Sequence, residues 1–357
     1  MAEPALQKER DAPSFKVLVG GSELPDEAAL DILEVRVSDY VEGAGSFTVA
    51  FNNWNSQTQE FKYVDGDLLA EGTEVEVRVG FVDDQKSLMK GEVTALEPEY
   101  AAGAAPVLRI HGYDLLHRFR RGRNTRSFAN MKDSQIADQI AAELGLRSLV
   151  EDTEITHEYV LQNNLTDIDF LLERARRIGF EVTVKDKTLN FRKAATDKGK
   201  LVSIDFGLTL TSFYPRLNTL GQVSDVVVQG WNPKTKEAIS GKAQPGDENS
   251  KMGGSKLGAS VSKEAFFKAT AFVVNKPVFN EGEAAQIARG KFNEMVADFI
   301  TGEGTAIGNT DIRAGEVIEL KGLGKRFSGL YYVTSSTHVV GPAGYRTMFT
   351  VGRNATT

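Results

Sequence analysis

Five arginines within nine residues form the most distinctive cluster of chemically active side chains in the sequence. The cluster comprises Arg118, Arg120, Arg121, Arg123 and Arg126, in the run RFRRGRNTR. Because guanidinium groups form paired hydrogen bonds with carboxylates and phosphates, the cluster predicts a contact with a partner protein or a neighbouring subunit. Two other interpretations stay open. One is a solvated or internally paired linker, and the other is a nucleic-acid contact, which the net charge of −7 disfavours.

Other residue types that support catalysis or metal binding are present but are not arranged for it. The four histidines form no His-x-x-x-His pattern on a helix, and the chain has no cysteine. No Gly-x-Ser-x-Gly motif occurs, and the glycine-rich runs at 302–308 and 322–325 lack the spacing of nucleotide-binding loops. The 49 acidic residues include no pair that the sequence singles out. We therefore predict no enzyme activity, no cofactor and no metal site.

The composition excludes several classes of protein. The net charge of −7 over 357 residues gives the chain no general attraction to nucleic acid or anionic lipid. Without cysteine it can form neither disulfides nor thiolate metal sites. No apolar run approaches the roughly 18 residues of a membrane span, and the first 15 residues lack the apolar core of a signal peptide. We therefore expect no direct membrane insertion.

The first third of the chain has the alternation that is typical of β-strands. Segments such as 32–37 (ILEVRV) and 74–81 (EVEVRVGF) place apolar residues at every second position, which buries one face of a strand. Turns separate these short segments, and 34 glycines against 10 prolines are consistent with many turns. We predict a mainly β fold with an inserted α/β unit, built as two antiparallel β-barrel domains, of which residues 1–127 form the first.

The insertion is predicted at 128–198. Apolar residues recur at helical spacing over 133–146 and again over 167–178, where Thr166 is the expected N-cap and Gly179 the expected stop. A short hairpin is expected to complete this α/β unit.

The second β-barrel domain is predicted at 199–357. Residues 241–262 are rich in glycine, serine and lysine and have few apolar side chains, so we expect a flexible excursion there. The spacing of apolar residues predicts a helix over 283–300.

The two β regions share an order of features. When the chain is shifted by 240 residues, Val93 falls on Val333 and Gly112 on Gly352. Identities are few, but both regions run through a strand, a polar loop, a long strand, a second loop and a strand that ends in glycine. An internal duplication and an unrelated pair of β domains both stay open.

Four stretches resemble, in order, the phage late control D family, which comprises tail-hub proteins of contractile phages and contractile injection systems and is related to VgrG spikes. The second stretch contains QNNLTDIDFL, which is similar to a motif that opens a helix in that family. The resemblance extends over nearly the whole chain, and four stretches carry it. They are His111–Phe128, Tyr159–Lys193, Ser212–Ala243 and Phe299–Thr356.

The resemblance implies a structural protein rather than an enzyme. It implies a homotrimer at the centre of a baseplate, whose six barrels form a pseudo-sixfold ring that adapts a hexameric inner tube to a trimeric spike. The implied partners are other copies of the chain, the inner tube protein, a spike protein and other baseplate proteins. The implied location is the bacterial cytoplasm during assembly, then a phage tail-like particle that is either released from the cell or anchored to a membrane.

The chain departs from the fused members of that family at its C-terminal end. Fused members continue into a further domain and a spike, whereas this sequence stops at Thr357. We therefore expect either a separate spike protein near Arg353, Asn354 and Thr357 or a shortened form of the chain, and we assign no membrane puncture. A β-rich module that binds carbohydrate or peptidoglycan and a cell-wall hydrolase remain the alternative functions.

The arginine cluster gives a first test. If it lies at a contact between subunits or baseplate proteins, reversing the charge of Arg120 and Arg121 weakens assembly more than folding, because each reversed charge repels the carboxylates it would have bound. Light scattering measures assembly and urea denaturation measures folding. Assembly that is unchanged by both reversals assigns the cluster to the solvated surface instead.

Overall fold

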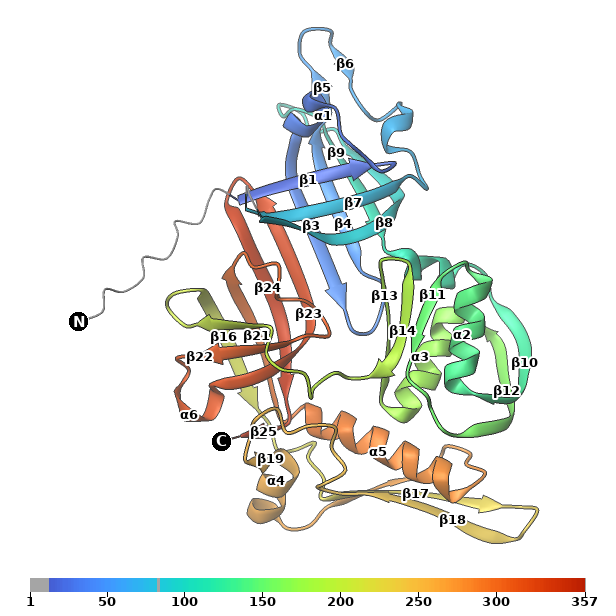
Figure 1. Cartoon of the computed structure of the whole chain (residues 1–357). Coiled ribbons are helices and arrows are strands. Elements are labelled where there is room, and N and C mark those ends of the chain that lie inside the picture. The colour runs from blue at the N-terminus through green and yellow to red at the C-terminus, as the bar shows by residue number, and fades with distance from the viewer. Residues whose placement is uncertain (1–12, 82–83, 357) are drawn as a thin grey trace.

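The computed structural model describes residues 13–81 and 84–356, which form two β parts and an α/β unit (Figure 1). In the first β part, strands bury every second side chain, as Phe47, Val49 and Phe51 show. Its elements are β1 (Pro13–Val19), β2 (Ser22–Glu23), α1 (Asp26–Leu30), β3 (Ile32–Tyr40), β4 (Ser46–Asn52), β5 (Trp54–Asn55), β6 (Glu60–Phe61), the 3-10 helix η1 (Asp67–Leu69), β7 (Glu74–Phe81), β8 (Asp84–Glu99), β9 (Val107–Tyr113) and the 3-10 helix η2 (Leu115–Arg120).

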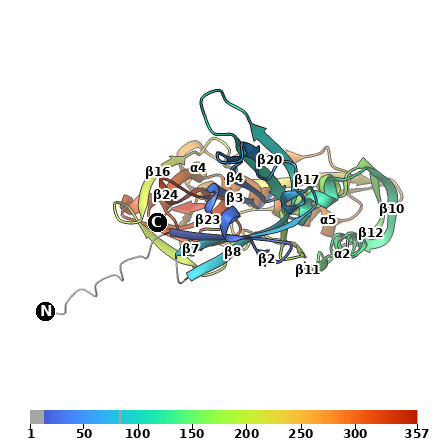
Figure 2. The same ribbon diagram turned by 90° about the horizontal axis from the view of Figure 1, so that it is seen from above.

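The α/β unit contains both predicted helices. The hydroxyl of Thr166 accepts a hydrogen bond from the backbone N–H of Asp169 at 3.1 Å, and Gly179 ends the second helix with a left-handed φ of 71°, as predicted. The unit lies at one end of the molecule, far from β16 and β24 (Figure 2). Its elements are β10 (Asn124–Lys132), α2 (Asp133–Glu143), β11 (Arg147–Val150), β12 (Thr156–Leu165), α3 (Asp167–Ile178), β13 (Phe180–Lys185) and β14 (Thr188–Lys193).

The second β part contains the third predicted helix, which begins and ends slightly earlier than the expected 283–300. Asn280 caps it by accepting a hydrogen bond from the N–H of Glu283 at 2.8 Å. The elements are β15 (Val202–Asp205), β16 (Leu210–Leu217), β17 (Asp225–Asn232), β18 (Glu237–Ala243), β19 (Lys256–Leu257), α4 (Gly258–Phe266), β20 (Thr270–Val273), α5 (Glu281–Ala297), β21 (Ile300–Ile307), β22 (Val317–Lys321), α6 (Gly324–Phe327), β23 (Gly329–Gly341), β24 (Gly344–Arg353) and β25 (Ala355–Thr356).

The segment 241–262, which we expected to be a flexible excursion, is anchored along its length. It includes the end of β18, all of β19 and the start of α4. Met252 is buried against Val317 and Tyr332, and β19 pairs with β25. The prediction of a flexible excursion was wrong because it rested on the low apolar content. The segment is held instead by backbone pairing and by one buried methionine.

One thirteen-stranded sheet includes strands of both β parts. Its order is β16-β21-β24-β23-β3-β4-β9-β8-β7-β1-β2, with β22 and β15 attached beside β23. The prediction of a mainly β fold is confirmed. No sheet among the described residues closes into a barrel, in contrast to the two barrels expected, because β3 and β23 pair with each other and join the two strand sets.

Each part buries a hydrophobic core of its own. Phe47 belongs to the core of the first β part, Phe349 to that of the second and Phe170 to that of the α/β unit. A fourth core lies between α5 and the sheet of β17, β18 and β20, around Phe292. Full burial of each such side chain contributes roughly 1.5–3 kcal/mol, so every part has its own source of stability.

Two glycines allow the α/β unit to approach the second β part closely. A Cβ atom on Gly290 of α5 would lie 2.5 Å from the backbone carbonyl carbon of Ile178, and one on Gly179 would lie 2.9 Å from the Cα of Gly290. Helix backbones can come this near only where side chains are absent. This contact fixes the position of α3 against α5.

Replacing Gly290 with alanine therefore destabilises the chain. The new methyl group meets backbone atoms, so α3 and α5 must separate, at a cost of about 1–3 kcal/mol in the free energy of unfolding measured with urea. Gly199→Ala is the matched control, since a Cβ there meets no atom within 4 Å. Equal stability of the two variants contradicts the close approach.

Candidate functional site

The two β parts repeat the same strand order. In the first, the order across the sheet is β3-β4-β9-β8-β7-β1, and in the second it is β16-β21-β24-β23-β22-β15. The first four pairings of each set are antiparallel, and only the last differs, since β15 runs parallel to β22. The equivalent strands also follow one another in the same order along the chain. This repetition favours the internal duplication that the sequence left open.

The repetition extends to single residues. The pairing of β8 with β9 is shifted by a bulge between Val93 and Ala95, and that of β23 with β24 by one between Val333 and Ser335, 240 positions later. Each bulge marks the start of a row of residues that are paired directly from strand to strand, so the row in the first β part can be matched with the row in the second. In the first part it is Ala95, His111, Thr48 and Arg36. In the second part it is Ser335, Thr350, Glu303 and Tyr214.

A single junction joins the two strand sets. β23 runs antiparallel to β3, with Thr337 opposite Ser38. The counterpart of β23 is β8 and the counterpart of β3 is β16. Among the described strands, none pairs with β8 beyond Val93 on the side away from β9, and none pairs with residues 211–217 of β16 on the side away from β21. These two open stretches of edge are the counterparts of the sheet's own internal junction.

The arginine cluster is divided between internal and free side chains. Arg118 pairs with Glu92 across to β8, and Arg126 bonds to Gln162 and Asp167 in the α/β unit, both at 2.8 Å. Arg123 donates to the carbonyl of Asn164 at 2.9 Å. These three side chains are paired internally, Arg118 within the first β part and the other two with the α/β unit, which fits the interpretation of an internally paired linker.

The other two arginines, Arg120 and Arg121, are exposed, and neither side chain forms a hydrogen bond or ion pair with another described residue. They remain available to a partner, so a contact role for the cluster remains a prediction that rests on these two side chains.

The C-terminal residues that we expected near a spike lie mostly inside the protein. Arg353 is 1% exposed; it donates to the carbonyl of Ser328 at 2.8 Å and its guanidinium lies 5.7 Å from the centre of the Tyr331 ring. Asn354 is also buried, and Thr357 lies outside the described residues. In this structure Arg353 and Asn354 stabilise the end of the second β part, and proximity of the chain end to a spike remains a prediction.

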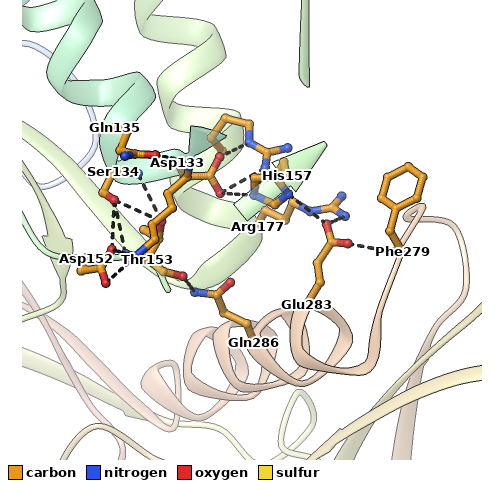
Figure 3. Close-up of polar contacts among 12 residues, drawn as sticks. Asp133, Ser134, Gln135, Asp152, Thr153, His157, Arg177, Phe279, Glu283 and Gln286 are labelled. Atoms are coloured by element: carbon orange, nitrogen blue, oxygen red, sulfur yellow. Dashed lines mark hydrogen bonds and ion pairs between the residues drawn. The ribbon is translucent and has the colours of Figure 1, made fainter. Parts of the chain in front are cut away.

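A buried network of charged side chains joins the α/β unit to α5 (Figure 3). Asp133 of α2 accepts two hydrogen bonds from Arg174 of α3, at 2.6 and 3.1 Å. The Nε2 of His157 on β12 lies 3.2 Å from Asp133, and its Nδ1 lies 3.7 Å from Glu283 of α5. Arg177 donates to Glu283 at 2.9 Å.

This network constrains how the α/β unit sits on α5. Burial alone would raise the pKa of Asp133, but hydrogen bonds from His157 and Arg174 hold it below its usual range. Because both carboxylates are nearly fully buried, any displacement of α5 would leave a charge without a partner. The network contributes to a unique orientation of the α/β unit on α5.

A cavity of about 760 Å³ lies where the α/β unit, α5 and the second β part meet. Glu181 and Tyr332 line it, and the hydroxyl of Tyr332 donates to the carboxylate of Glu181 at 2.6 Å. Burial raises the pKa of Glu181 to about 7. A carboxyl group of this kind can serve as a general acid, but here its oxygens bond to a tyrosine that belongs to the sheet.

Comparison with known proteins places the chain in a family. Its sequence over residues 9–341 matches the family described as the Alg8 N-terminal domain. The chain belongs to the Alg8 N-terminal domain family. The comparison with curated proteins found no match to the chain.

The fold of this Alg8-family chain is shared with solved phage tail structures. A 43 kDa tail protein of prophage MuSo2 from Shewanella oneidensis is 15% identical, with a TM-score of 0.70 over 96% of this chain and 98% of that one. A tail protein from Neisseria meningitidis is 13% identical, with a TM-score of 0.69 over 96% and 97%. The E. coli c3393 protein, described as a component of the type VI secretion system, is 10% identical, with a TM-score of 0.61 over 95% and 77%. At these identities the similarity shows the fold.

The histidines of the Alg8-family chain have structural partners. His111 and His117 contact Glu97 and Glu92, and His338 is buried beside the hydroxyl of Tyr345. Burial lowers the pKa of His338 to about 4, so it is neutral at pH 7. In the part of the chain that the structure describes, no three or more His, Asp or Glu side chains are grouped to hold a metal. Among residues 13–81 and 84–356, no helix has the length and apolar character that a membrane crossing requires.

Sequence reasoning missed two features of the candidate site. The open edges of β8 and β16 depend on pairing between residues hundreds of positions apart, for which one sequence contains no signal. The buried network was also missed, although Arg174 and Arg177 stand three residues apart on one helix, next to the buried face of α3. That spacing is the one sequence signal that could have indicated it.

Replacing Glu181 with glutamine tests the link between the α/β unit and the sheet. Because the pKa of Glu181 is raised from 4.5 to about 7, its contribution to stability is complete below pH 4.5 and is lost as the pH rises through 7. Glutamine imitates the protonated acid and does not titrate. Between pH 5 and 8 the free energy of unfolding should therefore fall further in the native chain than in the variant, by on the order of 2 kcal/mol. Urea denaturation at each pH measures this difference.

Glu237→Gln is the control for that experiment, since Glu237 is exposed and should leave the pH dependence unchanged. A Glu181→Gln variant whose stability follows the native pH profile would falsify the assignment of a raised pKa to this link.

Proposed function

We propose that the chain is a structural hub protein of a contractile, phage tail-like injection particle, of the late control D and VgrG type. Three copies close a pseudo-sixfold ring of six barrel-like modules, which adapts a hexameric inner tube to a trimeric spike. The observation that carries the proposal is that the open edges of β8 and β16 are the counterparts of the β23–β3 junction inside the chain. The same junction, repeated between copies, covers both edges.

The register of this contact follows from the matched rows. The rows match Ser335 with Ala95 and Arg36 with Tyr214. Two positions further along each strand, Thr337 corresponds to Glu97 and Ser38 corresponds to Arg216. Since Thr337 lies opposite Ser38 within the chain, Glu97 of one copy lies opposite Arg216 of the next. Opposite charges at directly paired positions stabilise two strands, so the pairing is electrostatically favourable.

The free edges are also protected against indiscriminate pairing. Each carries one proline, Pro98 in β8 and Pro215 in β16, and proline cannot donate to a ladder. A strand whose hydrogen-bond pattern allows for the missing N–H group can therefore pair with such an edge more readily than an arbitrary strand can. An obligate trimer of this kind buries more than about 2,000 Å² at each contact.

The proposed partners are further copies of the chain, an inner tube protein, a spike protein and other baseplate proteins, in a particle that is assembled in the cytoplasm. The shared fold of phage tail and type VI secretion proteins supports this setting. We propose no enzyme activity, because Glu181 is bonded to Tyr332 and the histidines have structural partners. The proposal includes neither nucleic-acid binding nor membrane insertion by this chain.

A charge exchange across the proposed contact tests both the trimer and its register. The native protein should scatter light as three 39.0 kDa chains. Arg216→Glu faces Glu97 with a like charge and should weaken trimer formation about tenfold or more, whereas the double variant Glu97→Arg with Arg216→Glu should restore it.

Arg346→Glu serves as the control, because Arg346 is an exposed arginine in the middle of the sheet. A native chain that stays monomeric at micromolar concentration contradicts the hub proposal. Failure of the double variant to rescue a disrupted trimer contradicts the register alone.

A further inference from the structure

One face of the sheet formed by β18, β17 and β20 lies bare. Helix α5 covers the other face, where Val228 and Ile239 are buried. Because strand side chains alternate between faces, the residues between these point away from α5. In Figure 1 that side of β17 and β18 points away from the rest of the molecule. The bare face is made by Val227, Gln229, Trp231, Ala238, Ser240, Lys242, Thr270 and Phe272, as the strand register places them.

Large apolar side chains lie along the middle of this bare face. Phe272 is 62% exposed and pairs with Val227, while Trp231 is 59% exposed and pairs with Ala238. Val274, just past β20, is also exposed. An antiparallel or mixed sheet that faces water normally carries polar side chains on that face. A tryptophan and a phenylalanine there indicate a surface that a partner covers.

Lysines surround one end of the apolar strip. The carboxylate of Asp225 lies 3.3 Å from Lys242 and 3.2 Å from Lys268, so one acid faces two cations. Both lysines, together with Lys263, line a hollow of about 530 Å³. The acids that line it are Asp225 and Glu264, and Glu264 is paired with Lys256, so positive charge is in excess at this end.

The charge of this region is opposite to that of the whole chain. Residues 224–279 contain eight lysines and five acidic residues, although the chain carries a net charge of −7. Lys236 lies in the turn at the far end of β17, beyond Trp231, whereas Lys234 in the same turn is paired with Glu158 of β12 at 3.1 Å. A lysine without an ion pair to another described residue is thus left at the far end of the strip, in addition to the lysines around the hollow.

The backbone beside the hollow adopts a strained conformation. Phe267 has φ 75° and ψ 177°, a region that glycine alone enters easily, and its side chain is 87% exposed. No burial among the described residues compensates the strain at this position. Phe266, its neighbour, is also largely exposed. Strain without internal compensation is typical of segments that bind a partner.

We propose that the bare face binds an extended, acidic segment of a separate protein, with apolar side chains at alternate positions. Apolar side chains at a period of two would lie on Phe272 and Trp231, and carboxylates would reach the lysines at each end. A second copy of the same face is excluded as the occupant, because two such faces would oppose lysine to lysine. A flat sheet face with this spacing fits a strand better than it fits a bilayer. The inference is independent of the hub proposal, since it needs one chain only.

The probe is a synthetic peptide of roughly eight residues with valine and phenylalanine at alternate positions in its middle and glutamates at both ends. Its binding to the full chain is measured by fluorescence anisotropy at rising salt. We expect binding that weakens with salt and falls about tenfold in Phe272→Ser with Trp231→Ser, since exposed aromatic anchors carry most of such a contact. The double variant Lys263→Glu with Lys268→Gln should weaken peptide binding by a similar factor. Lys242 is left unchanged in this variant so that Asp225 keeps an ion-pair partner.

Matched controls keep the result specific. Phe61→Ser removes an exposed aromatic side chain from the first β part, and Lys185→Glu reverses an exposed lysine in the α/β unit; neither should change binding. The unfolding midpoint of every variant shows that it is folded.

Three results would overturn the proposal. The first is equal binding of a peptide in which lysine replaces glutamate. The second is peptide binding that ignores the Phe272 and Trp231 substitutions. The third is no peptide binding together with capture by phosphatidylcholine vesicles containing phosphatidylserine, which would assign the face to a membrane surface. Because the peptide assay needs no trimer, failure here is distinguishable from failure of the hub proposal.

Discussion

An edge strand exposes a row of backbone N–H and C=O groups, and the need to pair them determines much of this architecture. The chain meets that need internally at the β23–β3 junction, where two strand sets of the same order become one sheet. Two stretches of edge stay open among the described strands, β8 beyond Val93 and residues 211–217 of β16. A chain built from two equivalent sets has edges that match one another, which is why a closed ring of copies is the arrangement that we propose.

The other contacts fix the accessory parts against this sheet. The glycine pair at 179 and 290 brings α3 close to α5, and the buried network around Asp133, His157 and Glu283 defines their orientation. Packing alone would allow the helices to slide, whereas buried charges tolerate few arrangements. The link between Glu181 and Tyr332 ties the α/β unit to the sheet as well. The α/β unit is thereby held rigidly on the second β part, on the side of α5 opposite the bare face.

Local signals in the sequence were reliable where the structure depends on neighbours along the chain. The apolar stripe, the Thr166 cap and the Gly179 stop of α3 appear as predicted, because helix ends are satisfied by residues within four positions. The segment 241–262 was misjudged, because its order comes from pairing of β19 with β25, about a hundred residues away. The sequence places Arg353 among the residues expected near a spike, and in the structure its buried guanidinium packs on Tyr331, a contact for which the local sequence contains no signal.

The amino-acid sequence by itself left open whether the two β regions are duplicates, but it determined the β-rich character, both helices of the insertion and the absence of disulfides. These follow from periodicity, capping and composition, which are properties of short stretches. Tertiary structure alone decided that the two strand sets share one sheet, that three of the five arginines are used internally and that one face below α5 stays bare. Each of those outcomes depends on which distant strands pair, and backbone hydrogen bonding between strands is nearly independent of side-chain identity, so a single sequence leaves that choice open.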